Sequence, residues 1–116
     1  MFEELIKAID YINDGNVISA GKYLIELAKN QDDEDILKVV AETEKELREI
    51  EDEKTLLDLD SKFRDQLIDV IRENIKWKKE KIRVLSLYLI DKMSKGNEIL
   101  LQMIRSPTEG RPHTFI

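Results

Sequence analysis

The sequence predicts an all-α fold: a small bundle of about five helices built on one long antiparallel helical hairpin. Apolar residues recur at spacings of three and four along most of the chain, which is the period of an amphipathic helix. Both prolines lie after residue 105, so no proline interrupts the helical pattern before that point. The chain therefore divides into one helical domain over residues 1–105 and an extended tail, containing Pro and Gly, over residues 106–116.

Composition places the chain among single-domain globular proteins. It has 116 residues, 41% of them hydrophobic, and exceeds the ~70–80 residues below which small domains need staples. The absence of cysteine excludes disulfides, thiolate zinc sites and a cysteine nucleophile. Charged residues reach 38%, with many Ile and few Gln, a composition typical of thermophile proteins. There is no signal peptide and no transmembrane run, so we expect a cytoplasmic protein with no membrane partner.

The chain begins with a helical hairpin. Its first helix runs from Phe2 to Asn13 and ends at the turn cluster that follows, Asn13-Asp14-Gly15-Asn16. Asn16 is then a good N-cap for the second helix. The apolar faces predicted for the two helices are Phe2, Leu5, Ile6, Ile9 and Ile12 in the first and Ala20, Leu24, Leu27 and Ala28 in the second.

This hairpin resembles a single tetratricopeptide repeat. Small and large residues alternate as in that family at Ala8, Tyr11, Gly15, Ala20, Leu24 and Leu27. The resemblance covers about 34 residues, one period of that repeat. Asp32 stands where the family has a proline, and no second copy follows. We interpret the segment as a helix-turn-helix packing unit and carry over no peptide-binding residues.

A repeat of alternating four- and three-residue steps predicts a third helix from Glu34 to about Leu57. The acidic loop Gln31–Asp35 leads into it, where carboxylates suit a helix N-terminus. Its spacing fits no calcium loop, so we expect no metal. The predicted seam is Ile36, Val40, Thr43, Leu47, Ile50, Lys54 and Leu57, and the predicted solvent face is Glu42, Glu44, Glu46, Glu49, Glu51, Asp52 and Glu53.

The stretch from Asp60 to Lys95 predicts one long helix, capped by Asp60 or Ser61, that pairs with the third. Its inward stripe has a gap, which the stem of Lys78 can cover while the ammonium reaches water or a carboxylate. The stripe is Leu67, Ile71, Ile75, Ile82, Leu85 and Leu89.

A basic stripe, Arg72, Lys76, Lys79 and Arg83, follows another face of this long helix. It either contacts nucleic acid or lies beside the acidic flank of the third helix. Trp77 falls on the opposite flank of the apolar stripe, as a core or interface residue. A base could therefore not stack on Trp77 while the stripe holds the same phosphate segment.

The C-terminal third of the chain carries more apolar surface than one helix face needs. Val84–Ile90 is apolar all round, as in a helix buried on two or more sides. Gly96 ends the long helix, and Asn97 caps a short apolar helix over Glu98–Arg105. The tail ends in an apolar pair that docks on a partner or folds back. The candidate partner-binding residues are Val84, Leu87, Tyr88, Ile90, Ile99, Leu100, Met103, Ile104, Phe115 and Ile116.

Nothing in the sequence builds a catalytic or cofactor site. The single histidine, His113, lies in the tail with no pre-oriented partner, and the four glycines form no phosphate-binding loop. We therefore expect no enzyme activity, no catalytic residues, no cofactor and no small-molecule substrate.

We expect a non-enzymatic interaction or assembly protein, either a homo-oligomer or a small accessory subunit of a larger complex. Residues 1–60 carry 7 basic and 18 acidic side chains, whereas residues 61–116 carry 12 and 7, so the two halves attract each other. Two alternatives stay open. One is a nucleic-acid-binding subunit that uses the basic stripe; the other is an acidic mimic of nucleic acid that uses Glu42, Glu46, Glu49 and Glu53.

Overall fold

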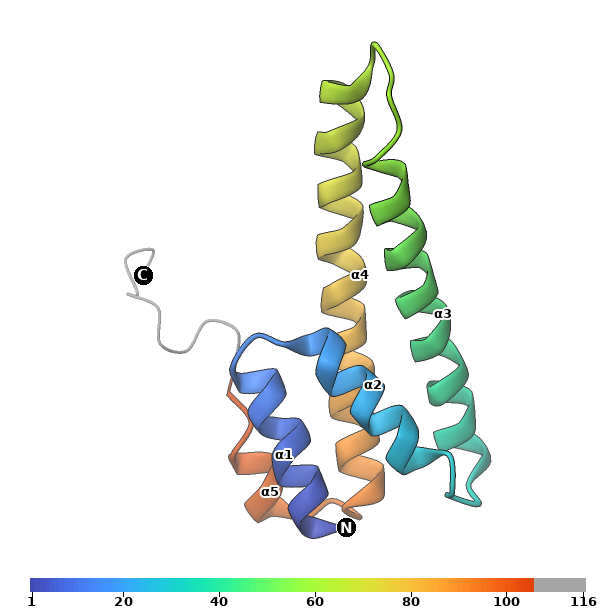
Figure 1. Cartoon of the computed structure of the whole chain (residues 1–116). Helices are drawn as coiled ribbons and strands as arrows, with labels where there is room; N and C mark the ends of the chain where they lie inside the picture. The colour runs from blue at the N-terminus through green and yellow to red at the C-terminus, as the bar shows by residue number, and fades with distance from the viewer. Residues whose placement is uncertain (106–116) are drawn as a thin grey trace, which may run out of the picture.

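The computed structural model describes residues 1–105 and contains five helices and no strand in that range. They are α1 (Phe2–Asn13), α2 (Val17–Ala28), α3 (Glu34–Leu56), α4 (Arg64–Met93) and α5 (Glu98–Gln102). The longest helices, α3 and α4, pack most extensively and form an antiparallel hairpin (Figure 1). The predicted all-α bundle built on this hairpin is therefore confirmed. The predicted tail, with Phe115 and Ile116, lies outside the described residues.

The short helices cover only one end of the hairpin. Figure 1 shows α1, α2 and α5 gathered around the end where α3 begins and α4 finishes. The other end, with the connection over residues 57–63, projects beyond them. At 30 residues, α4 is about 45 Å long. A large part of both long helices therefore lacks a third helix to pack against.

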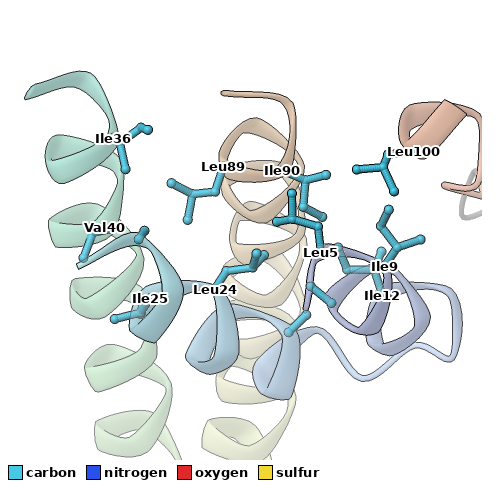
Figure 2. Close-up of a cluster of buried hydrophobic side chains, with 13 residues drawn as sticks. Leu5, Ile9, Ile12, Leu24, Ile25, Ile36, Val40, Leu89, Ile90 and Leu100 are labelled. Carbon is cyan, nitrogen blue, oxygen red and sulfur yellow. The ribbon is translucent and has the colours of Figure 1, made fainter. Parts of the chain in front are cut away.

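The main core lies at the covered end and draws on all five helices (Figure 2). Leu5 and Ile9 of α1 are essentially buried, as are Leu24 of α2 and Leu100 of α5. Full burial of one such side chain stabilises the fold by roughly 1.5–3 kcal/mol. The predicted inward faces of α1 and α2 are mostly confirmed; Phe2 is the exception at 47% exposed.

Small residues mark the place where α2 crosses the hairpin. Gly21, Thr43 and Ser86 are all buried there. A Cβ atom on Gly21 would lie 3.0 Å from Ile82 Cγ2 and 3.5 Å from Thr43 Cγ2. The Thr43 hydroxyl donates to the Val39 carbonyl at 2.7 Å, which satisfies it within its own helix. Thr43, a polar residue of the predicted α3 seam, is therefore tolerated in the core because it is small enough to fit beneath α2 and its hydroxyl is hydrogen-bonded.

Helix caps follow the sequence signals at three helices. The Asn16 side chain accepts from the Ser19 N–H at 3.4 Å. Asp33 accepts from two backbone N–H groups at the start of α3, at 2.8 and 3.3 Å. Asn97 does the same for α5 at 3.0 and 3.2 Å. Gly96 has a φ of +71°, the left-handed conformation that glycine adopts readily after a helix.

The start of α4 differs from the prediction. The helix begins at Arg64, and Phe63 occupies the N-cap position in place of Asp60 or Ser61. The Ser61 hydroxyl oxygen accepts from the Phe63 N–H at 3.1 Å, which holds a separate turn before the helix. Polar capping residues therefore order the connection and do not extend α4.

The end of α5 also differs, because the helix stops at Gln102 and not at Arg105. The side chain of Asn13 captures the backbone that follows. Its Nδ2 donates to the Met103 carbonyl at 2.9 Å, and its Oδ1 accepts from the Arg105 N–H at 2.9 Å. This α5 segment therefore docks on the chain's own α1.

Candidate interaction surface on α4

One face of α4 packs inward much as predicted. Ile71, Ile82 and Leu89 are buried along it. Lys78 fills the gap in this stripe, with its side chain 25% exposed and its Nζ 3.7 Å from Glu49 of α3. Leu67 departs from the prediction at 42% exposed, because it lies on the projecting end of the hairpin.

A second face of α4 carries six exposed apolar side chains. Four of them follow one another every seven residues, and two more belong to a second series offset by four residues. Trp77 is 61% exposed, and the least exposed member, Tyr88, is still 37% exposed. We call this set the outer face; it comprises Phe63, Leu67, Val70, Trp77, Val84 and Tyr88.

The spacing of the outer face is that of a helix-docking seam. Asn74 and Lys81 occupy its two remaining positions, so steps of four and three residues run unbroken from Phe63 to Tyr88. Such a repeat keeps one face turned toward a partner helix. Isolated exposed apolar residues are ordinary, but six of them along one face indicate an interaction surface.

Sequence reasoning missed most of this surface. It named Val84 and Tyr88 as partner-binding residues but not the four members that precede them. It also expected Trp77 in a core or an interface; the exposed indole contradicts the core and leaves the interface as a prediction. The signal was present in the sequence, although Asn74 and Lys81 interrupt the apolar repeat.

The other predicted partner-binding residues are dispersed. Ile90 and Leu100, at 0% and 1% exposed, fill the chain's own core and are closed to a partner, which corrects their assignment. Leu87 and Ile104 pack partly buried against that core. Ile99 and Met103 are exposed on α5 and after its end.

A charged cluster borders the outer face on the α3 side. Lys81 Nζ lies 2.7 Å from Glu42 Oε1 and 2.8 Å from Glu46 Oε1. Glu46 was predicted on the solvent face, but it is 4% exposed because Lys81 pairs with it between the helices. The hydrogen bonds to both carboxylates raise the pKa of Lys81 above its ordinary value. The hydrogen bond from Lys81 lowers the pKa of Glu42.

The basic stripe forms no ion pair with α3 in residues 1–105. This corrects the expectation that the stripe lies beside the acidic flank of that helix. The lysines that pair with α3 are Lys78 and Lys81. Arg83 pairs within its own helix, with its Nε 3.2 Å from Glu80. The other three members of the stripe form no ion pair with residues 1–105; they are Arg72, Lys76 and Lys79.

These three basic residues line an open groove of about 460 Å³. Gly15 and Val17, at the turn between α1 and α2, form its other side. Trp77 instead lies on the outer face, where its Nε1–H donates to Glu73 Oε1 at 2.8 Å. Lys76 leans toward the indole, with its Nζ 5.8 Å from the ring centroid.

Within residues 1–105, no three acidic or histidine side chains are grouped to hold a metal ion. None of the helices in that range is both long and apolar enough to cross a membrane. His113, the one histidine of the chain, lies outside the described residues.

No protein-family model, curated protein or solved structure matches this chain.

Proposed function

We propose that this protein is a non-enzymatic interaction and assembly protein whose protein partner docks along the outer face of α4. The observation that carries the proposal is the unbroken exposed seam from Phe63 to Tyr88. A helix is the partner element that fits, because steps of four and three residues match the surface period of another helix.

The composition of the outer face supports this proposal. Trp and Tyr are enriched among the residues that dominate binding energy at protein interfaces. Trp77 lies near the middle of the seam and Tyr88 at one end, with aliphatic side chains between and around them. The covered end of the hairpin anchors the C-terminal part of α4 in a packed core, so the helix that carries the seam is fixed at one end.

A site-specific cross-linking experiment tests the proposal. A photoactivatable amino acid replaces Val70 in the intact chain, and the matched control places it at Ile99, the most exposed large apolar side chain within residues 1–105. We expect one discrete protein adduct from position 70 in extracts of the source cells and none from position 99. Adding Val84→Glu to the position-70 chain should abolish that adduct.

Equal adducts from positions 70 and 99 would indicate general stickiness and would contradict a specific outer-face interface. The absence of any adduct at position 70, with the chain folded, would contradict it as well.

Nucleic-acid binding is a second candidate, favoured by the groove that Arg72, Lys76 and Lys79 line. Three cations beside an apolar residue, Ile75, suit a phosphate backbone. The net charge of −6 opposes free-standing binding, so this activity fits a subunit within a larger complex.

Three phosphate contacts predict a slope of log K against log salt near −3 for duplex DNA. Fluorescence anisotropy with a labelled duplex at low salt measures it, with Lys76→Glu and Lys79→Glu together as the disabling variant. If the intact chain forms no complex at low salt, binding of nucleic acid by the chain on its own is excluded.

The third hypothesis, an acidic mimic of nucleic acid, loses its support. Lysines of α4 hold Glu42, Glu46 and Glu49, three of the four carboxylates on which it depends.

A further inference from the structure

The groove of about 460 Å³ lies between α4 and the turn that joins α1 to α2. Arg72, Lys76 and Lys79 of α4 form its basic wall. The opposite wall, Gly15 and Val17, has no charged side chain. None of these residues belongs to the outer face, so the groove is separate from the docking surface of the proposed function.

The basic wall has no counter-ion within residues 1–105, because none of its three exposed side chains forms an ion pair there. One acidic residue, Glu80, also lines the groove, but its Oε1 lies 3.2 Å from Arg83 Nε. Glu73 is next to Arg72 in sequence, and its Oε1 accepts from the Trp77 indole at 2.8 Å on the outer face. The residues that line the groove therefore carry three positive charges against one paired negative charge.

The basic wall is short and is closed at both ends. Arg72 and Lys79 are seven residues apart, or about 10 Å along the helix. Asp69 and Asp65 lie three and seven residues before Arg72, so they continue the same helix face with the opposite charge. Toward the end of α4, the crossing helix α2 packs over this helix at Gly21.

These limits favour a short anion over a long one. A nucleic-acid strand along the basic wall would pass the carboxylates of Asp69 and Asp65 at one end and meet α2 at the other. Like charges brought together at a contact weaken it. A strand that crosses α4 instead would leave part of the basic wall without a phosphate. A small anion with several charges contacts all three cations and stays between the two ends.

The side chains of the groove suit phosphate. The planar guanidinium of Arg72 can donate two parallel hydrogen bonds to one phosphate, and the ammonium groups of Lys76 and Lys79 act as point charges. Linked phosphates carry their charges in a row, as the three cations do along α4. No aromatic side chain lines the groove, so a nucleobase would have no ring on which to stack.

From the three unpaired cations and the closed ends of the basic wall, we infer that the groove binds a small polyphosphate anion. Its recognised part is a chain of two or three linked phosphates, either free or carried by a nucleoside. Arg72, Lys76 and Lys79 hold this chain, while Ile75 and Val17 supply the apolar surface beside it. The inference goes beyond the proposed docking function and does not depend on it.

An NMR titration of the ¹⁵N-labelled full-length chain tests the inference at low salt without divalent metal. The titrants are inorganic triphosphate, adenosine triphosphate, orthophosphate and a short DNA duplex. We expect both triphosphates to shift the amide signals of Gly15, Val17 and residues 72–79 with saturation, and orthophosphate to bind more weakly. Equal affinity for the two triphosphates would assign the site to the phosphate chain alone. Tighter binding of adenosine triphosphate would assign it to a nucleotide, and either result supports the inference.

Two double variants with the same change in net charge separate local contacts from general attraction. Lys76→Gln with Lys79→Gln should weaken triphosphate binding about tenfold, because two charge-assisted contacts disappear. Lys38→Gln with Lys62→Gln removes two exposed lysines that do not line the groove and should leave the affinity unchanged. Equal weakening in both variants would mean unspecific attraction and would overturn the inference.

The other outcomes of the titration also decide the matter. Shifts that do not saturate, or that appear away from the groove, would overturn the inference, as would the absence of any shift. If the duplex saturates the same signals at a lower total phosphate concentration than triphosphate does, the ligand is nucleic acid and the small anion is wrong. The cross-linking at position 70 judges the docking face separately.

Discussion

Lys81 shows how one side chain joins the two long helices. Its Nζ bridges Glu42 and the nearly buried Glu46, at 2.7 and 2.8 Å. Replacing Lys81 leaves the Glu46 carboxylate without its counter-ion, and an unpaired buried charge is costly. The side chain of Lys81 is itself 48% exposed, so solvent reduces the loss below that of a fully buried pair.

We expect Lys81→Gln to lower the free energy of unfolding by about 1–2 kcal/mol. Urea denaturation measures the change. The matched control is Lys79→Gln, which removes another exposed lysine that pairs with no acid in residues 1–105 and should change stability by less than ~0.5 kcal/mol. Equal effects of the two substitutions would argue against the bridge.

Glu42 gives the same contact a pH dependence. Its pKa lies below the ordinary value of 4.5 because Lys81 hydrogen-bonds the ionised form. A lowered pKa in the folded state stabilises the protein above pH 4.5, and this contribution disappears as the pH falls through the lowered value. Carboxyl NMR titration should find the lowered pKa in the native chain and its return toward 4.5 in Lys81→Gln. An unchanged pKa in that variant would assign the shift to another group.

Gly21 is a residue whose size matters. Because Gly21 has no side chain, Ile82 and Thr43 pack close to its backbone. Their Cγ2 atoms would lie 3.0 and 3.5 Å from a Cβ atom at this position. Gly21→Val should overpack the crossing and destabilise the fold by about 1–3 kcal/mol. Lys22→Val, at the next and exposed position of α2, carries the valine without the clash and serves as the control in thermal unfolding. A similar loss of stability in both variants would mean that the low helix propensity of valine, and not overpacking at the crossing, causes the effect.

At the scale of elements, the α3–α4 hairpin has two unequal halves. The half beside α1, α2 and α5 is locked by the core that Leu24, Leu89 and Leu100 share. The projecting half contributes no residue to that core. A segment with fewer buried contacts opens at a lower free-energy cost. The two halves should therefore differ in local stability although they belong to the same helices.

Hydrogen exchange followed by mass spectrometry tests this difference. We expect the amides of residues 64–75 in α4 to exchange well before those of residues 82–93. A partner helix docked on the outer face should slow the first segment most, because that segment has least protection to begin with. Uniform exchange along α4 would show that the hairpin opens as one unit.

At the scale of the whole molecule, the net charge of −6 makes two copies of the chain repel each other. Repulsion between exposed charges is screened over ~10 Å at 0.1 M salt and over shorter distances as salt rises. We expect light scattering to find a monomer at low salt, with self-association appearing only at high salt and high protein concentration. Val70→Glu should suppress that association. A dimer that is tightest at low salt would require attractive charges between copies and would contradict this account.

Local rules fixed several features from the sequence alone. The periodicity of apolar residues determined the all-α class, the order of the helices and the inward faces of α1 and α2. Asn16, Asp33, Gly96 and Asn97 marked helix ends through short-range hydrogen bonds and backbone freedom. These features depend only on neighbours within one or two helical turns, so they can be predicted from the sequence.

Tertiary structure decided which faces of α4 stay open. Three stripes are readable on that helix, but the sequence does not say which of them α3 and α2 will cover. Packing buried Glu46 with Lys81, took Ile90 and Leu100 into the core, and left Trp77 and Val70 exposed. The physical reason is that α4 is longer than the bundle that covers it. Its exposed seam is therefore set by how far α1, α2 and α5 reach, which is a property of the whole fold.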